Sequence, residues 1–109
     1  MIRHITESDF KMIVVQSDKH LVIVDFWAPW CKPCQAMEDT WNSISRRFTT
    51  QLDIIKINVD DEPRVAQGSN VHSIPTMLFY QKGQVVKVEH GAKDENYLTG
   101  VITELLKKI

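Results

Sequence analysis

The sequence is poor in cysteine, glycine and proline, and it contains no long hydrophobic run. Its 109 residues include only two cysteines, four glycines and four prolines. These low numbers exclude a disulfide scaffold and a flexible linker between domains. The longest apolar stretches cover residues 12–15 and 21–28, far fewer than the roughly 20 residues of a transmembrane helix. We therefore expect a single domain over residues 1–109 that does not enter a membrane.

The sequence also lacks a surplus of either charge. Thirteen Lys and Arg against fourteen Asp and Glu give a formal net charge of −1. A nucleic-acid-binding domain usually carries a basic excess, so we expect no nucleic acid partner. The N-terminal residues have neither the apolar segment nor the small-residue cleavage site of a secretory signal peptide. These absences predict a cytoplasmic protein, in which a cysteine pair more often serves redox chemistry or metal binding than structure.

What the sequence does contain is a regular alternation of strand and helix patterns. Short, mostly apolar runs predict strands at residues 21–27, 52–59, 76–80 and 85–90. Apolar residues at helical spacing predict helices at residues 6–17, 34–48 and 60–67, and a last helix after Gly91. The order is roughly β-α-β-α-β-α-β-β-α, in which the first strand has no predicted residue range. It is typical of an α/β fold with a partly parallel sheet and a closing antiparallel hairpin.

Both cysteines lie in one short stretch, W-A-P-W-C-K-P-C at residues 27–34, where an apolar strand gives way to a helix. Residues three apart on a helix face the same way, so Cys31 and Cys34 can form a disulfide with little adjustment. Cys31 lies at the helix N-terminus, where free N–H groups and the helix dipole favour a thiolate. Cys34 lies one turn further on, on the apolar face, where burial favours the thiol. The spacing predicts Cys31 as the attacking cysteine and Cys34 as the resolving one, with Pro33 stiffening the turn.

This stretch resembles the active-site motif of the thioredoxin family, V-D-F-W-A-P-W-C-x-P-C, which spans residues 24–34. Further family motifs follow in the expected order: K-I-N-V-D at 56–60, S-I-P-T at 73–76 and G-A at 91–92. The resemblance implies a thioredoxin fold over residues 1–109, with a central mixed sheet of about five strands flanked by about four helices. It also implies a thiol–disulfide oxidoreductase that reduces protein disulfides and takes its electrons from a thioredoxin reductase. Such a protein needs no bound cofactor and acts as a monomer in electron transport and cell redox homeostasis.

The resemblance also implies roles for residues around the cysteines. Asp25 interrupts an apolar run, where burial should raise its pKa, and in thioredoxins the matching residue exchanges a proton with the buried cysteine. Lys56 matches a lysine that neighbours this carboxylate, and Pro75 matches a proline whose preceding peptide bond is cis. The residues that match the shallow apolar groove for target proteins are Trp30, Ile74, Pro75, Gly91 and Ala92. Simpler interpretations are an exposed Asp25 at a strand end, a solvated Lys56 at a strand margin, and Gly91 as a break between strand and helix.

Four positions depart from the family pattern. Lys32 replaces the usual glycine between the cysteines. Its charge either stabilises the Cys31 thiolate and makes the pair more oxidising, or is solvated with little effect. Asp39 stands where thioredoxins usually have a proline that kinks the helix, which predicts a straighter helix here. Ser73 replaces a glycine and His90 replaces an apolar residue. Both changes predict a different range of target proteins, and His90 would add a pH-dependent charge.

Other functions compete for the same motif. A structural zinc site has four ligands, usually including a second close pair of Cys or His. The histidines are instead scattered, at His4, His20, His72 and His90, and we expect no metal. Two cysteines supply half the ligands of an iron–sulfur cluster, which would then require a dimer. The remaining alternatives are a thioredoxin-fold subunit that binds a partner protein and a more oxidising disulfide oxidase or isomerase; a pure binding role would survive Cys31→Ser.

Overall fold

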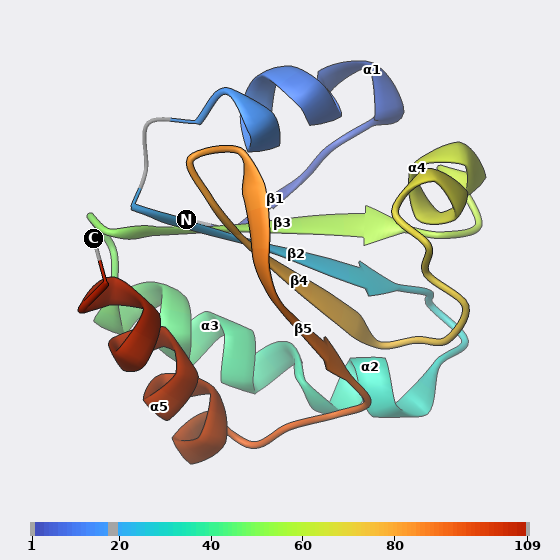
Figure 1. Cartoon of the computed structure of the whole chain (residues 1–109). Coiled ribbons are helices and arrows are strands. Elements are labelled where there is room, and N and C mark those ends of the chain that lie inside the picture. Colours follow the sequence, from blue (N-terminus) through green and yellow to red (C-terminus); the bar gives the residue numbers. More distant parts are fainter. Residues whose placement is uncertain (1, 18–19, 109) are drawn as a thin grey trace.

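In residues 2–17 and 20–108, which the computed structural model describes, five strands form one mixed sheet (Figure 1). The strands are β1 (Ile2–His4), β2 (Leu21–Trp27), β3 (Leu52–Asn58), β4 (Thr76–Gln81) and β5 (Gln84–His90). They lie in the order β1-β3-β2-β4-β5. β3 pairs in parallel with β1 and β2, whereas β4 pairs antiparallel with β2 and β5. This mixed sheet confirms the predicted α/β class and the closing hairpin.

Helices cover both faces of the sheet (Figure 1). They are α1 (Glu7–Phe10), a π-helix (Lys11–Val15), α2 (Lys32–Ala36), α3 (Glu38–Arg47), α4 (Pro63–Gly68) and α5 (Glu95–Leu106). Figure 1 shows α1 and α4 over one face and α3 and α5 over the other. Among the described residues, no helix is both long and apolar enough to cross a membrane.

β2 is buried on both faces, as its nearly continuous apolar sequence predicts. Side chains alternate between the two faces along a strand. Leu21 and Ile23 pack into the core with α3 and α5, whereas Val22 and Phe26 pack with α4 on the opposite face. Asp25 continues the row of Leu21 and Ile23, so its carboxyl group is directed to the side of the sheet that α3 covers.

The helix after the cysteines is interrupted, although Asp39 stands in place of the expected proline. α2 ends at Ala36 and α3 begins at Glu38, with Met37 between them at φ −90° and ψ −3°. The prediction of a straighter helix is therefore wrong. Burial of Met37 anchors the break in the core. Glu38 and Asp39 place negative charge in the first turn of α3, where the helix dipole favours it.

The helix predicted at residues 60–67 begins later in the structure. α4 starts at Pro63 rather than at residue 60. The N–H groups of Asp61 and Glu62 donate back to the carbonyl oxygen of Asn58 and form a turn at the end of β3. Pro63 then fits the first helical position, because that position needs no N–H donor.

The turn between β4 and β5 consists of Lys82 and Gly83, since the strands extend to Gln81 and from Gln84. Both turn residues have positive φ, 52° and 78°. A Cβ atom on Gly83 would lie 2.5 Å from the carbonyl oxygen of Val15. Glycine is therefore required where the hairpin approaches the N-terminal helical segment.

α5 packs largely as its amphipathic pattern predicts. Leu98 and Ile102 are fully buried in the core, but the neighbouring Tyr97 is 45 % exposed. The Tyr97 hydroxyl donates a 2.6 Å hydrogen bond to Glu89 Oε2 on β5. This bond holds the polar end of the ring at the rim of the core. Asp94 precedes the helix and accepts a 2.8 Å hydrogen bond from the Tyr97 N–H, which caps the helix.

Candidate active site

The two cysteines form a disulfide where β2 leads into α2. Their Cα atoms are 5.3 Å apart, within the usual range for a disulfide. Cys31 is the N-cap residue of α2, and Pro33 falls in the first turn, where a missing N–H donor is tolerated. The structure thus brings the two cysteines together at the strand-to-helix junction predicted from the sequence.

The two sulfur atoms differ in hydrogen bonding rather than in burial. Cys31 and Cys34 are 4 % and 3 % exposed, so the apolar surroundings predicted for Cys34 apply to both residues. The backbone N–H of Cys34 donates a hydrogen bond to Cys31 Sγ over 3.2 Å. This donor, together with the N-terminal end of α2, favours negative charge on Cys31.

Trp30 directly precedes Cys31, and most of its side chain is exposed to solvent. It is 67 % exposed, yet its indole Nε1–H donates a 2.9 Å hydrogen bond to Asp60 Oδ2. Asp60 is itself held by a 2.9 Å hydrogen bond from its N–H to Asn58 Oδ1. No role for Asp60 was predicted. Its place just after β3 was the available signal, because the carboxyl ends of parallel strands meet at one edge of a sheet.

Trp30 and Ile74 line a shallow hollow of about 410 Å³. Its other walls come from Val59, Ala66, Val71, His72 and Ser73. Ile74 also packs against the disulfide, so the hollow and the redox centre share a wall. Pro75, Gly91 and Ala92, which the resemblance places in the same groove, are not among the residues that line it.

Pro75 brings the loop before β4 next to the end of β5. The Ile74–Pro75 peptide bond is cis, which confirms the expectation from the family resemblance. The carbonyl oxygen of Pro75 accepts a 2.9 Å hydrogen bond from the Gly91 N–H. Gly91 has a φ of 82°, a value that residues with a side chain rarely adopt. Gly91 therefore both follows the end of β5 and holds the loop that carries Pro75.

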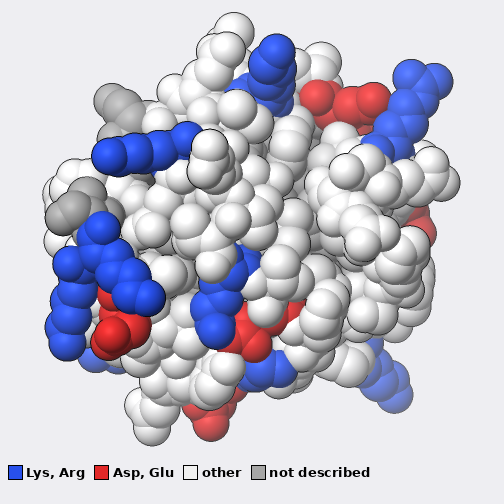
Figure 2. All heavy atoms as spheres, in the orientation of Figure 1, with Lys and Arg blue, Asp and Glu red and all other residues white. Residues whose placement is uncertain are grey.

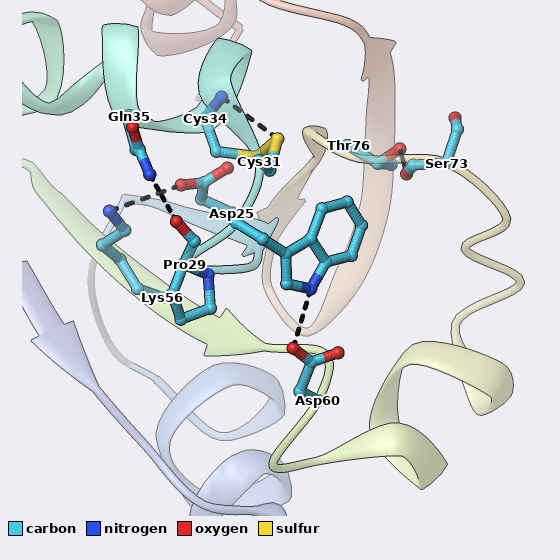
Figure 3. The surroundings of a disulfide bond; sticks show 10 residues. Asp25, Pro29, Cys31, Cys34, Gln35, Lys56, Asp60, Ser73 and Thr76 are labelled. Carbon is cyan, nitrogen blue, oxygen red and sulfur yellow. Dashed lines mark hydrogen bonds and ion pairs between the residues drawn. A yellow bond between two sulfur atoms is a disulfide. The ribbon is translucent and has the colours of Figure 1, made fainter.

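His90 lies against the same loop. Its Nδ1 is 3.2 Å from Thr76 Oγ1, and the Thr76 hydroxyl donates a 2.6 Å hydrogen bond to the carbonyl oxygen of Ser73 (Figure 3). Two of the positions that depart from the family pattern, Ser73 and His90, are thus joined through one buried threonine. Ser73 lines the hollow beside Trp30, whereas His90 is not part of that lining.

Asp25 and Lys56 form a buried pair on the α3 side of the sheet. They are register partners in the parallel strands β2 and β3, and Lys56 Nζ lies 3.9 Å from Asp25 Oδ2 (Figure 3). Asp25 is 2 % exposed and Lys56 is 7 % exposed. Neither is therefore the solvated residue of the simpler interpretation. Figure 3 draws the Asp25 carboxyl group between the Lys56 side chain and the disulfide.

Burial dominates the acid–base chemistry of Asp25. Burial raises the pKa of this carboxyl group to about 6, and the positive charge of Lys56 opposes part of that rise. Lys56 Nζ also lies 4.8 Å from the centre of the Trp27 ring, a favourable cation–π arrangement. Asp25 is consequently ionised for the most part at pH 7, yet it takes up a proton at only slightly lower pH. A carboxyl group tuned in this way can serve as a proton acceptor and donor near neutral pH.

Comparison with known proteins agrees with this geometry. A family model described as Thioredoxin matches residues 1–104. The chain belongs to the thioredoxin family. It is similar to a thioredoxin of Haemophilus influenzae, with 37% identity over 103 residues that cover 94% of this chain and 95% of the relative. It is also similar to thioredoxin 1 of a Nostoc species (35% over 102 residues, 94% of each chain) and to the thioredoxin of Porphyra purpurea (31% over 105 residues, 96% and 97%).

Family membership and the Cys31–Cys34 disulfide together define the general chemistry. The protein is a thiol–disulfide oxidoreductase, and its cysteine pair is a redox-active disulfide. The mixed sheet flanked by helices is accordingly the thioredoxin fold.

Charge is spread over the surface of this thioredoxin-family chain. Figure 2 shows basic and acidic side chains interspersed on one face, with uncharged surface between them. Lys32, between the two cysteines, is exposed, and an exposed charge interacts only weakly with its neighbours through water. Within the described residues, no three His, Cys, Asp or Glu side chains gather into a group that could hold a metal ion.

Proposed function

We propose that this protein reduces disulfides in target proteins in the cytoplasm, with electrons supplied by a thioredoxin reductase. The observation that carries the proposal is the hydrogen bond from the Cys34 N–H to Cys31 Sγ at the N-terminus of α2. This bond supports Cys31 as the sulfur that carries negative charge in the reduced protein, and the thiolate is the form that attacks a disulfide.

In the first step, the Cys31 thiolate attacks one sulfur of the target disulfide. A bond forms between Cys31 Sγ and that sulfur, and the second target sulfur leaves as a thiolate that takes a proton from water. Trp30 and Ile74 offer an apolar surface beside the reacting sulfur. The proposed groove also includes Pro75, Gly91 and Ala92, which would contact the target backbone beyond that hollow.

In the second step, the Cys34 thiol loses its proton to the Asp25 carboxylate and attacks Cys31 Sγ. The Cys31–Cys34 disulfide forms, and the remaining target sulfur leaves as a thiolate. That thiolate takes up the proton that Asp25 then releases, so the target gains two electrons and two protons: the protein supplies both electrons and the Cys34 proton, and water supplies the proton of the first step. The raised pKa of Asp25 supports this role, because a carboxylate with a pKa of about 6 holds a proton more readily than an ordinary one. The positive charge of Lys56 limits the rise in the pKa of Asp25.

The cysteine roles are tested by trapping the mixed disulfide. Reduced Cys34→Ser, incubated with a disulfide-bonded test protein such as insulin, should accumulate a covalent complex that a reducing agent dissolves. Reduced Cys31→Ser is the matched control and should form none. A complex with Cys31→Ser but not with Cys34→Ser would reverse the assignment. Full biological activity of Cys31→Ser would favour the partner-binding alternative.

The direction of electron flow is tested by the reduction potential of the Cys31–Cys34 pair. Equilibration in dithiothreitol buffers, followed by tryptophan fluorescence, gives this potential. A value close to thioredoxin's about −270 mV supports a reductase. A value of about −200 mV or higher favours the oxidase or isomerase alternative.

A further inference from the structure

Trp41 and Asp25 each carry a buried polar atom without a hydrogen-bond partner. Among the described residues, Trp41 Nε1 and Asp25 Oδ1 form no hydrogen bond of normal geometry. Trp41 is 1 % exposed and Asp25 is 2 % exposed, so solvent does not supply the missing partners. Buried polar atoms are rarely left without a partner. Core packing alone accounts for the burial of the Trp41 ring but leaves this pair of polar atoms unexplained.

The two side chains lie on the same side of the sheet, the side that α3 covers. Asp25 continues the row of Leu21 and Ile23 on β2, and Trp41 packs in the same cluster as those two residues. After burial, which raises the pKa of Asp25, two groups lower it: first the charge of Lys56 and then the indole of Trp41. The indole is therefore a neighbour of the carboxyl group, although no hydrogen bond of normal geometry joins the two side chains. Contacts of this kind are often long in a resting structure and tighten during the reaction.

Trp41 and Lys56 line a second pocket. It has a volume of about 190 Å³, and its other lining residues are Ile2, His4, Glu38 and Asn42. It shares no residue with the hollow that Trp30 and Ile74 line. Lys56 thus lies between this pocket and the buried carboxyl group, because its Nζ is 3.9 Å from Asp25 Oδ2.

We propose that Trp41 is a positioning residue for Asp25: its indole N–H is the donor that orients and stabilises the carboxylate after Asp25 releases its proton. This inference rests on the proposed role of Asp25 as the proton acceptor for Cys34. Lys56 supplies the charge on one oxygen of the carboxylate, and Trp41 supplies a donor for the other. The carboxylate is then available for the next proton at neutral pH, inside a core that would otherwise hold Asp25 protonated.

Other titratable groups lie around Asp25 and Trp41, and their ionisation also contributes to any pH dependence measured there. They are His4 on β1, Lys56 on β3, Glu38 on α3, and Cys31 and Cys34 at α2. His4 contacts the ring of Trp27, with the two ring centres 5.7 Å apart. Burial and the nearby charge of Lys56 lower the pKa of His4, while Glu38 raises it. In the oxidised protein the cysteines do not titrate, which removes them from the measurement.

The test is a titration of the Asp25 carboxyl group by carbon-13 NMR in the oxidised protein. Trp41→Phe keeps most of the ring and removes the N–H donor. The titration midpoint of Asp25 should rise by about one pH unit, because the charged form loses a hydrogen-bond donor. Ile44→Val is the matched control: it disturbs the same helix and core cluster without removing a polar group, and the midpoint should stay in place. An unchanged midpoint in Trp41→Phe, or an equal rise in Ile44→Val, overturns the inference.

A second measurement uses the unmodified tryptophan and does not depend on the folding of a Trp41 variant. The indole N–H resonance of Trp41 should shift with the same midpoint as Asp25 in the oxidised protein, and it should stay constant in Asp25→Asn. The exposed Trp30 serves as the internal control, and its resonance should not follow that midpoint. A Trp41 resonance that ignores the ionisation of Asp25 overturns the inference.

The kinetic consequence separates this inference from the proposed function. In Trp41→Phe, the pH profile of the step that releases the target should move upward together with the midpoint of Asp25. If the midpoint moves and the profile does not, Trp41 acts on Asp25 but Asp25 is not the proton acceptor, and the proposal fails as an account of the reaction. If neither moves while the target is still reduced, the inference about Trp41 fails and the proposed function stands.

Discussion

Lys56 Nζ lies 3.9 Å from Asp25 Oδ2, inside the protein and beyond the length of a direct hydrogen bond. The register of β2 and β3 places the two residues side by side on the α3 face of the sheet. This arrangement lowers the electrostatic penalty of a buried carboxylate without removing it. Asp25 therefore keeps a raised pKa despite a cation in its immediate surroundings.

The buried carboxyl group should make the oxidised protein less stable at neutral pH than in mild acid. The pKa of Asp25 is raised from 3.8 to about 6 by burial, so the folded protein binds a proton between these values that the unfolded chain has lost. The free energy of unfolding therefore falls as pH rises through this window, by about 3 kcal/mol in total. Urea unfolding of the oxidised protein at pH 4 and at pH 7 measures this difference. Asp25→Asn should remove most of it and should be more stable than the original protein at pH 7.

Asp61→Asn provides the control for that experiment, because Asp61 is exposed. It should retain the pH dependence of the original protein. Equal stability of Asp25→Asn and the original protein at pH 7 would show that the Asp25 carboxylate is already fully compensated.

The hydrogen bond from Trp30 to Asp60 should matter for binding of the target rather than for the chemical step. Trp30 is largely exposed, and its Nε1–H is held by Asp60 Oδ2 at 2.9 Å. Asp60→Ala frees the Trp30 indole. Binding a target must then order this side chain, which costs about 1 kcal/mol more and raises KM about fivefold. We expect kcat to stay within about twofold, since a bond that only orders the binding surface acts before the chemical step. Steady-state reduction of a disulfide-bonded protein separates the two parameters. Asp61→Ala should change neither, and a loss confined to kcat in Asp60→Ala would contradict this role.

Lys32 should raise the reduction potential slightly. Its exposed ammonium stabilises a Cys31 thiolate, and such charge pairs contribute about 0.2–1 kcal/mol. Lys32→Met removes the charge and should make the potential more negative by about 5–20 mV, because about 30 mV corresponds to 1.4 kcal/mol for a two-electron couple. Lys32→Arg keeps the charge and should leave the potential in place. The difference should shrink at high salt; an identical potential in all three proteins at low salt would make Lys32 a bystander.

The interrupted helix should tolerate a proline at Asp39. Asp39 lies in the first turn of α3, before the first hydrogen bond of that helix, which Trp41 N donates to Met37 O. Asp39→Pro should therefore change the free energy of unfolding by less than about 1 kcal/mol. Asn42→Pro, in the middle of the same exposed helix face, should cost about 3 kcal/mol or more. Chemical denaturation of the two variants measures both values, and equal losses would show that Asp39 N–H is needed for the helix.

The sequence by itself located β2, β3, β4 and β5, though not β1, and it determined the site of the cysteines and the family. Mostly apolar runs predicted β2 and β3, because a strand covered on both faces has few polar positions. The junction of β2 with a helix placed Cys31 at a helix N-terminus through local rules alone. Asp25 was recognisable because a carboxylate within such a run has few explanations other than a functional one.

Only the tertiary structure decided what surrounds those residues. The break at Met37, the bond from Trp30 to Asp60 and the equal burial of both cysteines depend on packing between segments far apart in the chain. The approach of Trp41 to Asp25 likewise depends on how α3 lies over β2. Periodicity identifies which face of a helix is buried, but every residue on that face has the same pattern. Which of them meets a buried carboxyl group is set by the three-dimensional arrangement of helix and sheet.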